Sequence, residues 1–451
     1  TGGLSTRFEL AVEVNNIIPM EETFEELDIN EEDEKQILEL SQDPEVFKKL
    51  SKSIAPSIWG HEEIKKSLVL QLFGGVQKEM SDGSKSRGDI HILMVGDPGV
   101  AKSVMLGFMA NISPKGRYVV GKSASGAGLT ATVVRDEYLK GWSLEAGAMV
   151  LANKGLVCID ELEKMDPQDR SAMHEAMEQQ SVTISKANVH ASLKAQTSVL
   201  AAANPKFGRF DPYQSIAQQI DLPPTLINRF DIIFTLRDLP DKMKDEKIAS
   251  HVLDEHQSKN ATDIIERNLF RKYVAYAKQR INPELSKEAT KFLKDFYVDL
   301  RNRPVSSDSA VKPIPISARQ LQALIRMAEA SAKLRLSKTI TKADAEEAIE
   351  LMKYYLMQVG YDYDSKTIDI DRITTGVTSS QRSKIMTVRD TIAHLEGRLG
   401  SLIPREEIEK ELKDKLSTEE IEEAIRKLQA SGDIFKPKRG YIQKTKKKKK
   451  N

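Results

Sequence analysis

Cysteine is almost absent from this chain. One of its 451 residues is a cysteine, Cys158, so disulfide frameworks and cysteine-rich zinc sites are excluded. A single thiol is typical of proteins that work in a reducing compartment. Long apolar runs are missing as well, and we find neither a signal-peptide pattern nor a stretch of transmembrane length. We therefore expect a cytoplasmic location and no membrane partner.

A surplus of charge of either sign is also missing. The chain has 68 Lys and Arg against 67 Asp and Glu, which gives a formal net charge of +1. The charges are unevenly placed, because residues 21–35 are rich in acidic side chains and the chain ends in a lysine run. A hydrophobic fraction of 40% with 30% charged residues is typical of globular proteins, and 451 residues exceed one ordinary core. We expect two to four domains.

The first 40 residues predict the end of a domain and a linker. Residues 1–19 alternate between apolar and polar side chains like a final strand, and acidic residues then fill 20–35. We interpret 1–40 as the end of a truncated N-terminal domain followed by an acidic linker. A helix is expected to open at Pro44, because proline is favoured in a first helical turn.

Residues 90–236 predict an α/β core. Short apolar runs such as DIHILMVG, GLVCID and TSVLAAANP alternate with helical stretches, which is typical of buried parallel strands joined by helices. Residues 245–358 show helical periodicity throughout. Three short helices and a β-hairpin then follow in the order of a winged helix, with Ser417 and Glu420 as a capping box. The assigned domains are an α/β core at 41–240, a helical domain at 241–360, a linker at 361–379, a winged-helix domain at 380–443 and a basic tail at 444–451.

The stretch GDPGVAKS, directly after an apolar run, predicts a phosphate-binding loop. Gly96 and Gly99 allow successive backbone N–H groups to point at phosphate oxygens, and the helix that begins near Lys102 adds its dipole. Lys102 should reach the β and γ phosphates, and Ser103 should hold Mg²⁺. The glycine that normally precedes the lysine is Ala101, whose methyl group is tolerable only where that residue keeps a helical φ. A glycine-rich turn in a core is the alternative interpretation.

An acidic pair and an asparagine at later strand ends support this interpretation. Asp160 and Glu161 end the apolar run GLVCID, where a metal ion and an attacking water would lie in a parallel sheet. Asp160 would hold the metal ion through a bridging water, and Glu161 would deprotonate the attacking water. Asn204 ends the next apolar run and could bond to the same water or to the γ phosphate. In isolation, the acidic pair could be a solvated strand end and Asn204 a turn former.

Together these motifs resemble those of AAA+ ATPases, and more narrowly the motor region of archaeal minichromosome maintenance (MCM) replicative helicases. The resemblance covers about residues 40–360 and extends more weakly to the C-terminus. It depends on the stretches GDPGVAKS, IDELEKM, HEAMEQQ, AAANPKFGRFD, LPPTLINRFD and SARQLQALIRMAEA. It implies a P-loop α/β fold with a parallel sheet, helices on both faces, β-hairpin insertions, a helical lid and a small winged helix.

The resemblance also assigns roles to individual residues. Asn204 corresponds to sensor 1, Arg229 to the arginine finger and Arg319 to the sensor-2 arginine, and both arginines act across a subunit boundary in this family. Asn228 stands where the family usually has serine, and Trp59 where it usually has tyrosine. The implied ATP-binding residues are Gly96, Asp97, Pro98, Gly99, Val100, Ala101, Lys102, Ser103, Ile58 and Trp59. The residues implied to hold Mg²⁺ are Ser103 and Asp160. The residues implied to act in catalysis are Lys102, Asp160, Glu161, Asn204, Arg229 and Arg319.

Two insertions point to a DNA channel. Residues 182–195 predict two short strands around a turn, and by resemblance this is a hairpin whose tip projects into the channel of a hexamer, with Lys186 on a DNA phosphate. An ordinary hairpin with a solvated lysine is the alternative. A second insertion at about 123–145 resembles another channel-facing element of the family. The winged helix could bind DNA, but its acidic helix favours an interaction or regulatory module.

These interpretations leave three functions to compare. The favoured one is an ATP-driven homo-hexameric helicase that translocates on DNA in replication, associated with the nucleoid of an archaeal cell and with other replication proteins. An AAA+ protein remodeller is the first alternative, and its channel loop should carry an aromatic grip. A non-catalytic ring subunit is the second, and an incomplete nucleotide site would mark it. Here the expected nucleotide-site residues are all present.

Overall fold

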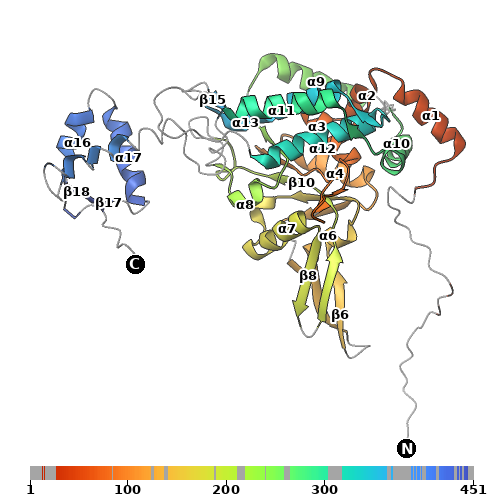
Figure 1. Cartoon of the computed structure of the whole chain (residues 1–451), viewed down its shortest axis with the longest axis horizontal. Coiled ribbons are helices and arrows are strands. Elements are labelled where there is room, and N and C mark those ends of the chain that lie inside the picture. The colour runs from red at the N-terminus through yellow and green to blue at the C-terminus, as the bar shows by residue number, and fades with distance from the viewer. Residues whose placement is uncertain are drawn as a thin grey trace, which may run out of the picture.

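A computed structural model of the chain gives the architecture of most of its length (Figure 1). It describes residues 13, 15, 27–83, 85–122, 126–136, 141–186, 189–210, 219–238, 240–257, 265–302, 317–362, 367–368, 387–389, 391–392, 394–396, 398, 403–412, 416–430, 434–435, 437–438 and 441–444.

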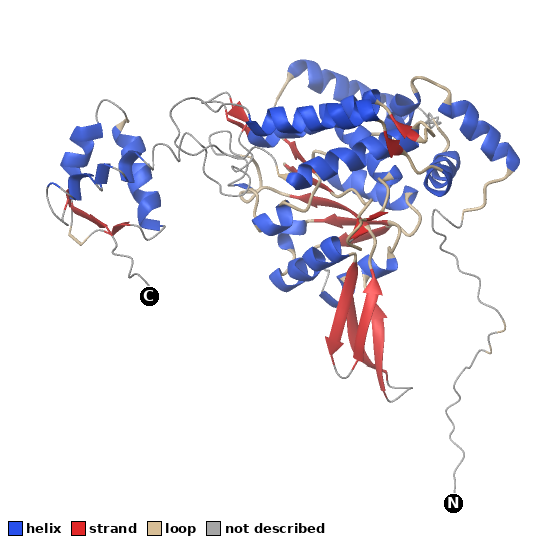
Figure 2. Ribbon diagram, viewed as in Figure 1, coloured by secondary structure: helices blue, strands red, loops and turns tan. Residues whose placement is uncertain are grey.

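A five-stranded parallel sheet forms the centre of the main body (Figure 2). Its strand order is β11-β3-β10-β7-β4, and every neighbouring pair is parallel, as the apolar runs predicted. All residues of four of these strands are buried, because helices cover both faces. The bounds are β3 Ile92–Gly96, β4 Arg117–Val120, β7 Leu156–Asp160, β10 Ser198–Ala203 and β11 Ile232–Leu236.

Helices pack against this sheet and continue into a helical lid above it in Figure 1. In the lid, α12 packs on α3 and α13, and α13 also packs on β11. Among its described residues, the segment predicted as all helix contains a short exception, since Glu284–Leu285 and Thr339–Ile340 pair as parallel strands β12 and β13. The helices are α3 Glu62–Phe73, α4 Lys102–Ile112, α7 Pro167–Gln179, α9 Lys242–Gln257, α10 Arg267–Arg280, α11 Lys287–Asn302, α12 Ala318–Leu334 and α13 Lys342–Gly360.

The expected acidic linker is partly a helix. Helix α1, Glu31–Ser41, starts with a capping box between Asn30 and Asp33. Two of its acidic side chains face the lid, where Asp33 pairs with Lys272 and Glu34 with Arg280 on α10. Helix α2 is Val46–Ser53, so Pro44 precedes the helix rather than opening it. The strand expected at 1–19 lies outside the described residues, apart from two positions.

Two antiparallel hairpins project from the sheet's body, side by side (Figures 1 and 2). One is β5 Ala131–Asp136 with β6 Gly141–Ala146, and the other is β8 Ser181–Lys186 with β9 Val189–Lys194. Both expected insertions therefore form hairpins. The remaining elements of the main body are β1 Lys78–Glu79, β2 Lys85–Ser86, α5 Gly126–Leu129, α6 Ala148–Leu151, the 3-10 helix η1 Leu162–Lys164 and α8 Pro224–Ile227.

The C-terminal residues build a small core of their own. A three-stranded sheet of order β16-β18-β17 packs with two helices and with the helical residues 387–389, 391–392 and 394–396 around buried aliphatic side chains. The capping box of Ser417 and Glu420 is confirmed, while the winged-helix assignment stays a prediction. The expected linker contains the short pair β14 Tyr361–Asp362 and β15 Thr367–Ile368. The C-terminal elements are β16 Ile403–Pro404, α16 Arg405–Leu412, α17 Thr418–Ala430, β17 Ile434–Phe435 and β18 Tyr441–Lys444.

Within the described part of the chain, the helices are too short or too polar to span a lipid bilayer.

Candidate nucleotide-binding and hydrolysis site

The ends of three neighbouring strands bring the expected nucleotide-site residues together. Strand β10 pairs with β3 on one side and with β7 on the other. The P-loop follows β3, Asp160 ends β7, and Asn204 follows β10. Because parallel strands end at one edge of a sheet, these groups share a single crevice.

The P-loop is fastened to the last strand of the sheet. A Cβ added at Gly96 would come within 2.8 Å of the Leu236 side chain, so only glycine fits this approach. The buried Asp97 carboxylate accepts hydrogen bonds from the backbone N–H groups of Phe210 and Asp238, at 2.8 and 2.9 Å. The Asp97 side chain is thus part of the loop's support, and only its backbone can serve a ligand.

The expectation of a helical φ at Ala101 is wrong. Ala101 is left-handed, with φ of 63°, and it is the cap of α4. Glycine adopts this conformation freely, whereas an alanine there costs about 1–2 kcal/mol. The chain carries this strain where the loop turns into the helix, and Gly99, at φ of 87°, supplies the other left-handed position.

Lys102 is the first residue of α4 and is 7% exposed. Its ammonium group donates hydrogen bonds to the carbonyls of Gly96 and Asp97, at 2.6 and 2.7 Å. Burial lowers the pKa of Lys102, and the neighbouring carboxylates of Asp160 and Glu163 oppose this shift. A cation held inside the loop by carbonyls alone is suited to bind an anionic phosphate.

Tyr118 on β4 joins two residues that were expected at the metal site. Its hydroxyl donates to the Asp160 carboxylate at 2.8 Å and is also within hydrogen-bonding reach of the Ser103 hydroxyl. Burial raises the pKa of Tyr118 to about 12, and the bond to Asp160 adds to the shift. Nothing in the local sequence selects Tyr118, because only strand pairing places it beside Asp160.

Glu161 and Asn204 each have a partner that the sequence interpretation missed. Glu161, left-handed at φ of 53°, pairs with Lys164 at 2.6 Å, and this bond raises the pKa of Lys164. Glu163 accepts hydrogen bonds from the Asn204 side chain at 2.9 Å and from its backbone N–H at 3.1 Å. The motif IDELEKM thus holds the expected sensor asparagine through Glu163.

The donor set fits Mg²⁺ shared with a nucleotide. Ser103 and Asp160 offer a hydroxyl and a carboxylate, which are the hard oxygen ligands this ion prefers. Among the described residues, no group of three or more His, Cys, Asp or Glu could hold a metal alone. The ion would therefore depend on phosphate oxygens for its remaining ligands.

The loop between α2 and α3 carries Ile58 and Trp59, which the resemblance places at the ATP-binding site, on its adenine side. The Lys65 ammonium donates to the carbonyls of Ala55 and Ile58, at 3.1 and 2.7 Å, and burial lowers its pKa to about 8. From α9, the His251 Nε2 lies 2.9 Å from the Pro56 carbonyl. Beside this loop is a groove of about 430 Å³ lined by Trp59, Met243, Glu246, Lys247, Ser250, His251 and Asp254.

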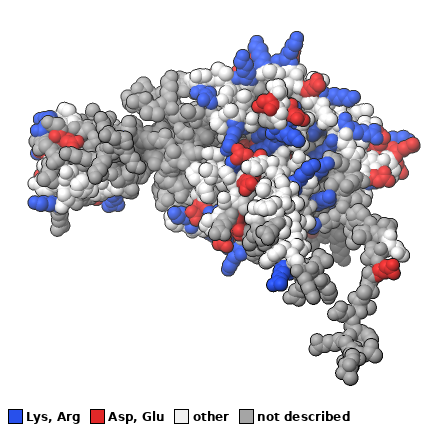
Figure 3. Space-filling view, turned by 60° about the horizontal axis from the view of Figure 1, so that its bottom comes forward, with Lys and Arg blue, Asp and Glu red and all other residues white. Residues whose placement is uncertain are grey.

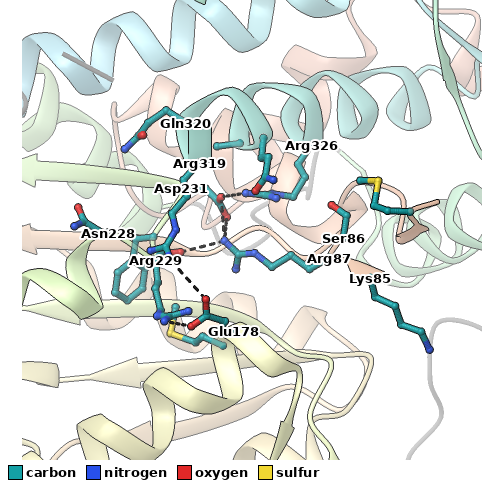
Figure 4. A pocket seen from close by; sticks show the side chains of 15 residues that line it. Lys85, Ser86, Arg87, Glu178, Asn228, Arg229, Asp231, Arg319, Gln320 and Arg326 are labelled. Atoms are coloured by element: carbon teal, nitrogen blue, oxygen red, sulfur yellow. Dashed lines mark hydrogen bonds and ion pairs between the residues drawn. The ribbon is translucent and has the colours of Figure 1, made fainter. Parts of the chain in front are cut away.

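Arg229 and Arg319 meet at a second place (Figure 4). Both pair with Glu178 of α7, and the Arg319 Nη2 lies 3.6 Å from one carboxylate oxygen. Among the described residues that line their cavity of about 230 Å³, none belongs to the P-loop. The two expected catalytic arginines therefore lie together, and not in the crevice of their own chain's P-loop.

A buried ion cluster supports this arginine face. Asp231 accepts hydrogen bonds from Arg87 at 3.1 Å, from Arg326 on α12 at 2.5 Å and from the His91 backbone N–H at 2.8 Å. The Asp231 and Arg326 side chains are 3% and 5% exposed. Figure 4 shows the Asp231 carboxylate joined to Arg87 and to Arg326.

Lys186 is the last residue of β8 and pairs with Val189 across the hairpin. Its strand position agrees with the predicted hairpin, and the turn at 187–188 lies outside the described residues.

Comparisons with known proteins extend these observations to the family level. A family model described as the MCM P-loop domain matches residues 33–256, and one described as the MCM AAA-lid domain matches residues 268–356.

Three relatives cover most of this chain. It is 46% identical over 388 residues to minichromosome maintenance protein MCM from Saccharolobus solfataricus, covering 86% of this chain and 56% of that protein. It is 42% identical over 372 residues to DNA replication licensing factor MCM4 from Arabidopsis thaliana, covering 82% and 43%. With licensing factor mcm7 from Schizosaccharomyces pombe it shares 41% over 377 residues, covering 82% and 49%. The chain spans about half the length of the curated relatives it matches.

Proposed function

The chain belongs to the minichromosome maintenance (MCM) family, and we propose that it is the motor region of a replicative DNA helicase. In this proposal six copies form a ring, hydrolyse ATP at their boundaries and translocate on DNA in the central channel. The single observation that carries the proposal is the convergence of the P-loop, Asp160 and Asn204 on adjacent strand ends.

The described residues support a definite division of labour in hydrolysis. Lys102 exchanges its carbonyl partners for the phosphates of ATP. Glu161 accepts a proton from the attacking water, and Asn204, held by Glu163, orients that water. When bound, Mg²⁺ would neutralise charge on the ATP phosphates; Ser103 would hold it directly and Asp160 through a water. Glu161→Gln should therefore keep ATP binding and lose most hydrolysis, whereas Lys102→Ala should abolish hydrolysis.

The separation of the arginines from the P-loop supports a site shared between subunits. Arg229 and Arg319 form one face with Glu178, and a neighbouring copy would bring its γ phosphate to them. An arginine finger accelerates phosphoryl transfer about 10³–10⁵-fold. An isolated chain therefore has an incomplete site, which is the reason to expect a ring.

The charge pattern supports DNA binding by the assembled ring rather than by one chain. On the face in Figure 3, described Lys and Arg side chains are interspersed with Asp and Glu instead of forming one basic surface. Six copies of Lys186 around one axis would concentrate positive charge on a DNA backbone. The hairpin sequence from Ser181 to Lys194 has no aromatic residue, which disfavours a grip on polypeptide.

The test is Lys186→Ala, with ATP hydrolysis and forked-DNA unwinding measured on one preparation. Unwinding should fall to background while hydrolysis continues, because the change lies on the hairpin and not at the phosphate site. The slope of log affinity against log salt should also shrink, by about 0.7–0.9 for each DNA phosphate that is no longer neutralised. Lys194→Ala, at the base of the same hairpin, is the matched control and should unwind normally.

If Lys186→Ala unwound DNA at the wild-type rate, the proposal that the hairpin binds DNA would be contradicted. Loss of hydrolysis together with unwinding would make the hairpin a structural brace instead. We also propose that residues 380–443 form a winged-helix module for interactions with other replication proteins.

A further inference from the structure

Glu178 makes contacts that the proposed hydrolysis mechanism does not use. One of its carboxylate oxygens accepts a hydrogen bond from Arg229, which comes from the segment before β11. The other lies 3.6 Å from Arg319, at the start of α12. Both contacts occupy guanidinium groups that are expected to meet a neighbour's phosphate. The hydrogen bond from Arg229 is the largest cause that lowers the pKa of Glu178, and the charge of Arg319 lowers it further.

This ion pair is open to competition. The Glu178 side chain is 52% exposed, whereas Arg229 is 10% exposed and its buried Nε has no partner among the described residues. Phosphate oxygens form strong charge-assisted hydrogen bonds with arginine, and an exposed ion pair contributes little. A γ phosphate at this face would therefore take the arginines and release Glu178.

The two backbone segments that carry Arg229 and Arg319 are tied to each other. Arg326 lies on α12, two turns after Arg319, and its bond to the buried Asp231 ties α12 to the segment that carries Arg229. Figure 4 shows this cluster on one side of the arginines and Glu178 on the other. When a phosphate competes for the arginines, Glu178 and the end of α7 are therefore the parts that move.

Glu178 is the last residue but one of α7, and the hairpin begins directly after that helix. Gln180, left-handed at φ of 54°, connects the helix to β8, and its carbonyl accepts a hydrogen bond from the backbone N–H of Ala195, the residue after β9, at 2.8 Å. Helix α7 also packs against β8. A shift at the end of α7 is thus passed to both strands of the hairpin.

We propose that Glu178 is a positioning residue that couples a neighbour's nucleotide to the β8–β9 hairpin of its own subunit. While the neighbouring site is empty, Glu178 holds Arg229 and Arg319 and fixes the end of α7. When the neighbour presents a γ phosphate, the carboxylate is released and the hairpin base is free to move. This inference rests on the proposed function, in which both arginines act across the boundary.

The test places a reporter on the hairpin. An environment-sensitive thiol dye is attached at Ser192→Cys, a position on β9. The one natural thiol, Cys158, is buried, and burial raises its pKa, so it does not compete for the dye. A non-hydrolysable ATP analogue is added to the assembled chain, and its binding is followed separately with a fluorescent nucleotide.

The analogue should change the dye signal in the parent chain. In Glu178→Gln the change should fall at least fivefold, although the analogue still binds. The KM for ATP should drop about two- to fivefold without loss of kcat, because a competing acceptor has been removed. A merely structural Glu178 would raise KM or lower kcat instead.

Glu175→Gln is the matched control, since Glu175 is an exposed glutamate on the same helix and the substitution removes the same charge. It should keep the full dye response. An equal response in Glu178→Gln overturns the inference. Arg229→Ala distinguishes failure of the proposed shared site from failure of the coupling. Full hydrolysis by Arg229→Ala overturns the shared site itself. If Arg229→Ala abolishes hydrolysis but Glu178→Gln keeps a normal dye response, only the coupling is overturned.

Discussion

Tyr118 places a hydroxyl where two expected metal ligands meet. It donates to Asp160 and lies within reach of Ser103, so its hydroxyl competes with a metal ion for the carboxylate. We expect Tyr118→Phe to lower the Mg²⁺ concentration for half-maximal ATP hydrolysis about two- to fivefold, since one hydrogen bond contributes roughly 0.5–1.5 kcal/mol. A Mg²⁺ titration of the hydrolysis rate measures this.

Tyr276→Phe is the control for that titration. Tyr276 also donates to a carboxylate, Glu34, at 3.0 Å, but on α10 in the lid. Its removal should leave the Mg²⁺ requirement unchanged. A higher Mg²⁺ requirement in Tyr118→Phe would mean that the hydroxyl positions Asp160 for the ion rather than competing with it.

Ala101 provides a stability prediction. Because its φ of 63° strains an alanine but not a glycine, Ala101→Gly should raise the free energy of unfolding by up to about 1 kcal/mol. Thermal melting of the unliganded chain gives the change. Ala110→Gly, inside the regular part of α4, should instead lower the free energy of unfolding by about 1 kcal/mol. Equal decreases in both variants would contradict the left-handed geometry.

The residues that could be predicted from the sequence are those whose chemistry is contained in one local stretch. Lys102, Asp160 and Asn204 each follow or end an apolar strand, and the order of a parallel sheet brings their strand ends together. Tyr118, Glu163 and Glu178 were missed because their roles depend on partners from other elements. Strand order and side-chain direction decide those contacts, and neither can be read from one stretch alone.

At the scale of elements, helix α9 contacts the loop before α3 through a hydrogen bond from His251 and through Lys247, whose ammonium lies 5.9 Å from the centroid of the Trp59 ring. His251 bonds to the Pro56 carbonyl and so connects this exposed helix to the loop that carries Trp59. We expect His251→Ala to raise the KM for ATP about three- to tenfold with kcat within twofold, because one hydrogen bond to the base-side loop is removed and no phosphate contact changes.

Steady-state kinetics with ATP measure the effect of His251→Ala. Glu255→Ala is the control, since Glu255 lies one turn further along the same helix, past the residue that bonds to the loop. It should match the parent chain. A fall in kcat with unchanged KM in His251→Ala would show instead that α9 acts on the chemical step.

Elements were predictable where hydrophobic pattern dominates. The buried strands and the lid helices follow their apolar periodicity. Helix α1 was missed because its acidic residues are typical of a linker. The buried Ile37 and the ion pairs of Asp33 and Glu34 with α10 explain which side it turns to the lid. The two-residue strands β12 and β13 carry no pattern of their own and exist because α11 and α13 begin beside each other.

At the scale of the whole molecule, the shared site predicts complementation. Rings of Lys102→Ala lack a P-loop cation, and rings of Arg229→Ala lack the finger, so each alone should be nearly inactive. When the two chains exchange subunits, some boundaries combine an intact P-loop with an intact finger. Mixed rings should then regain partial hydrolysis, well above the mean of the separate preparations.

The measurement is the hydrolysis rate against mixing ratio, with a maximum expected near equal amounts. A straight line between the two end points would place Arg229 in the site of its own chain. A mixture of Lys102→Ala and Glu161→Gln is the control. Both substitutions lie on the P-loop side of a boundary, so no boundary in the mixed ring has a complete site and hydrolysis should not recover.

The strand order also dictates when the site comes into existence. Ile92 of β3 pairs with Leu200 and with Ile232, both synthesised long after the P-loop itself. Closing such distant pairs is slow, since loop entropy is lost before the contacts form. A nascent chain that has emerged only as far as α7 carries the complete P-loop sequence. It still lacks β10 and β11, the neighbours of β3, and with them the Leu236 side chain that lies against Gly96. The pocket around the P-loop therefore needs strands that are synthesised after the loop itself, and it is complete only once β10 and β11 have paired with β3.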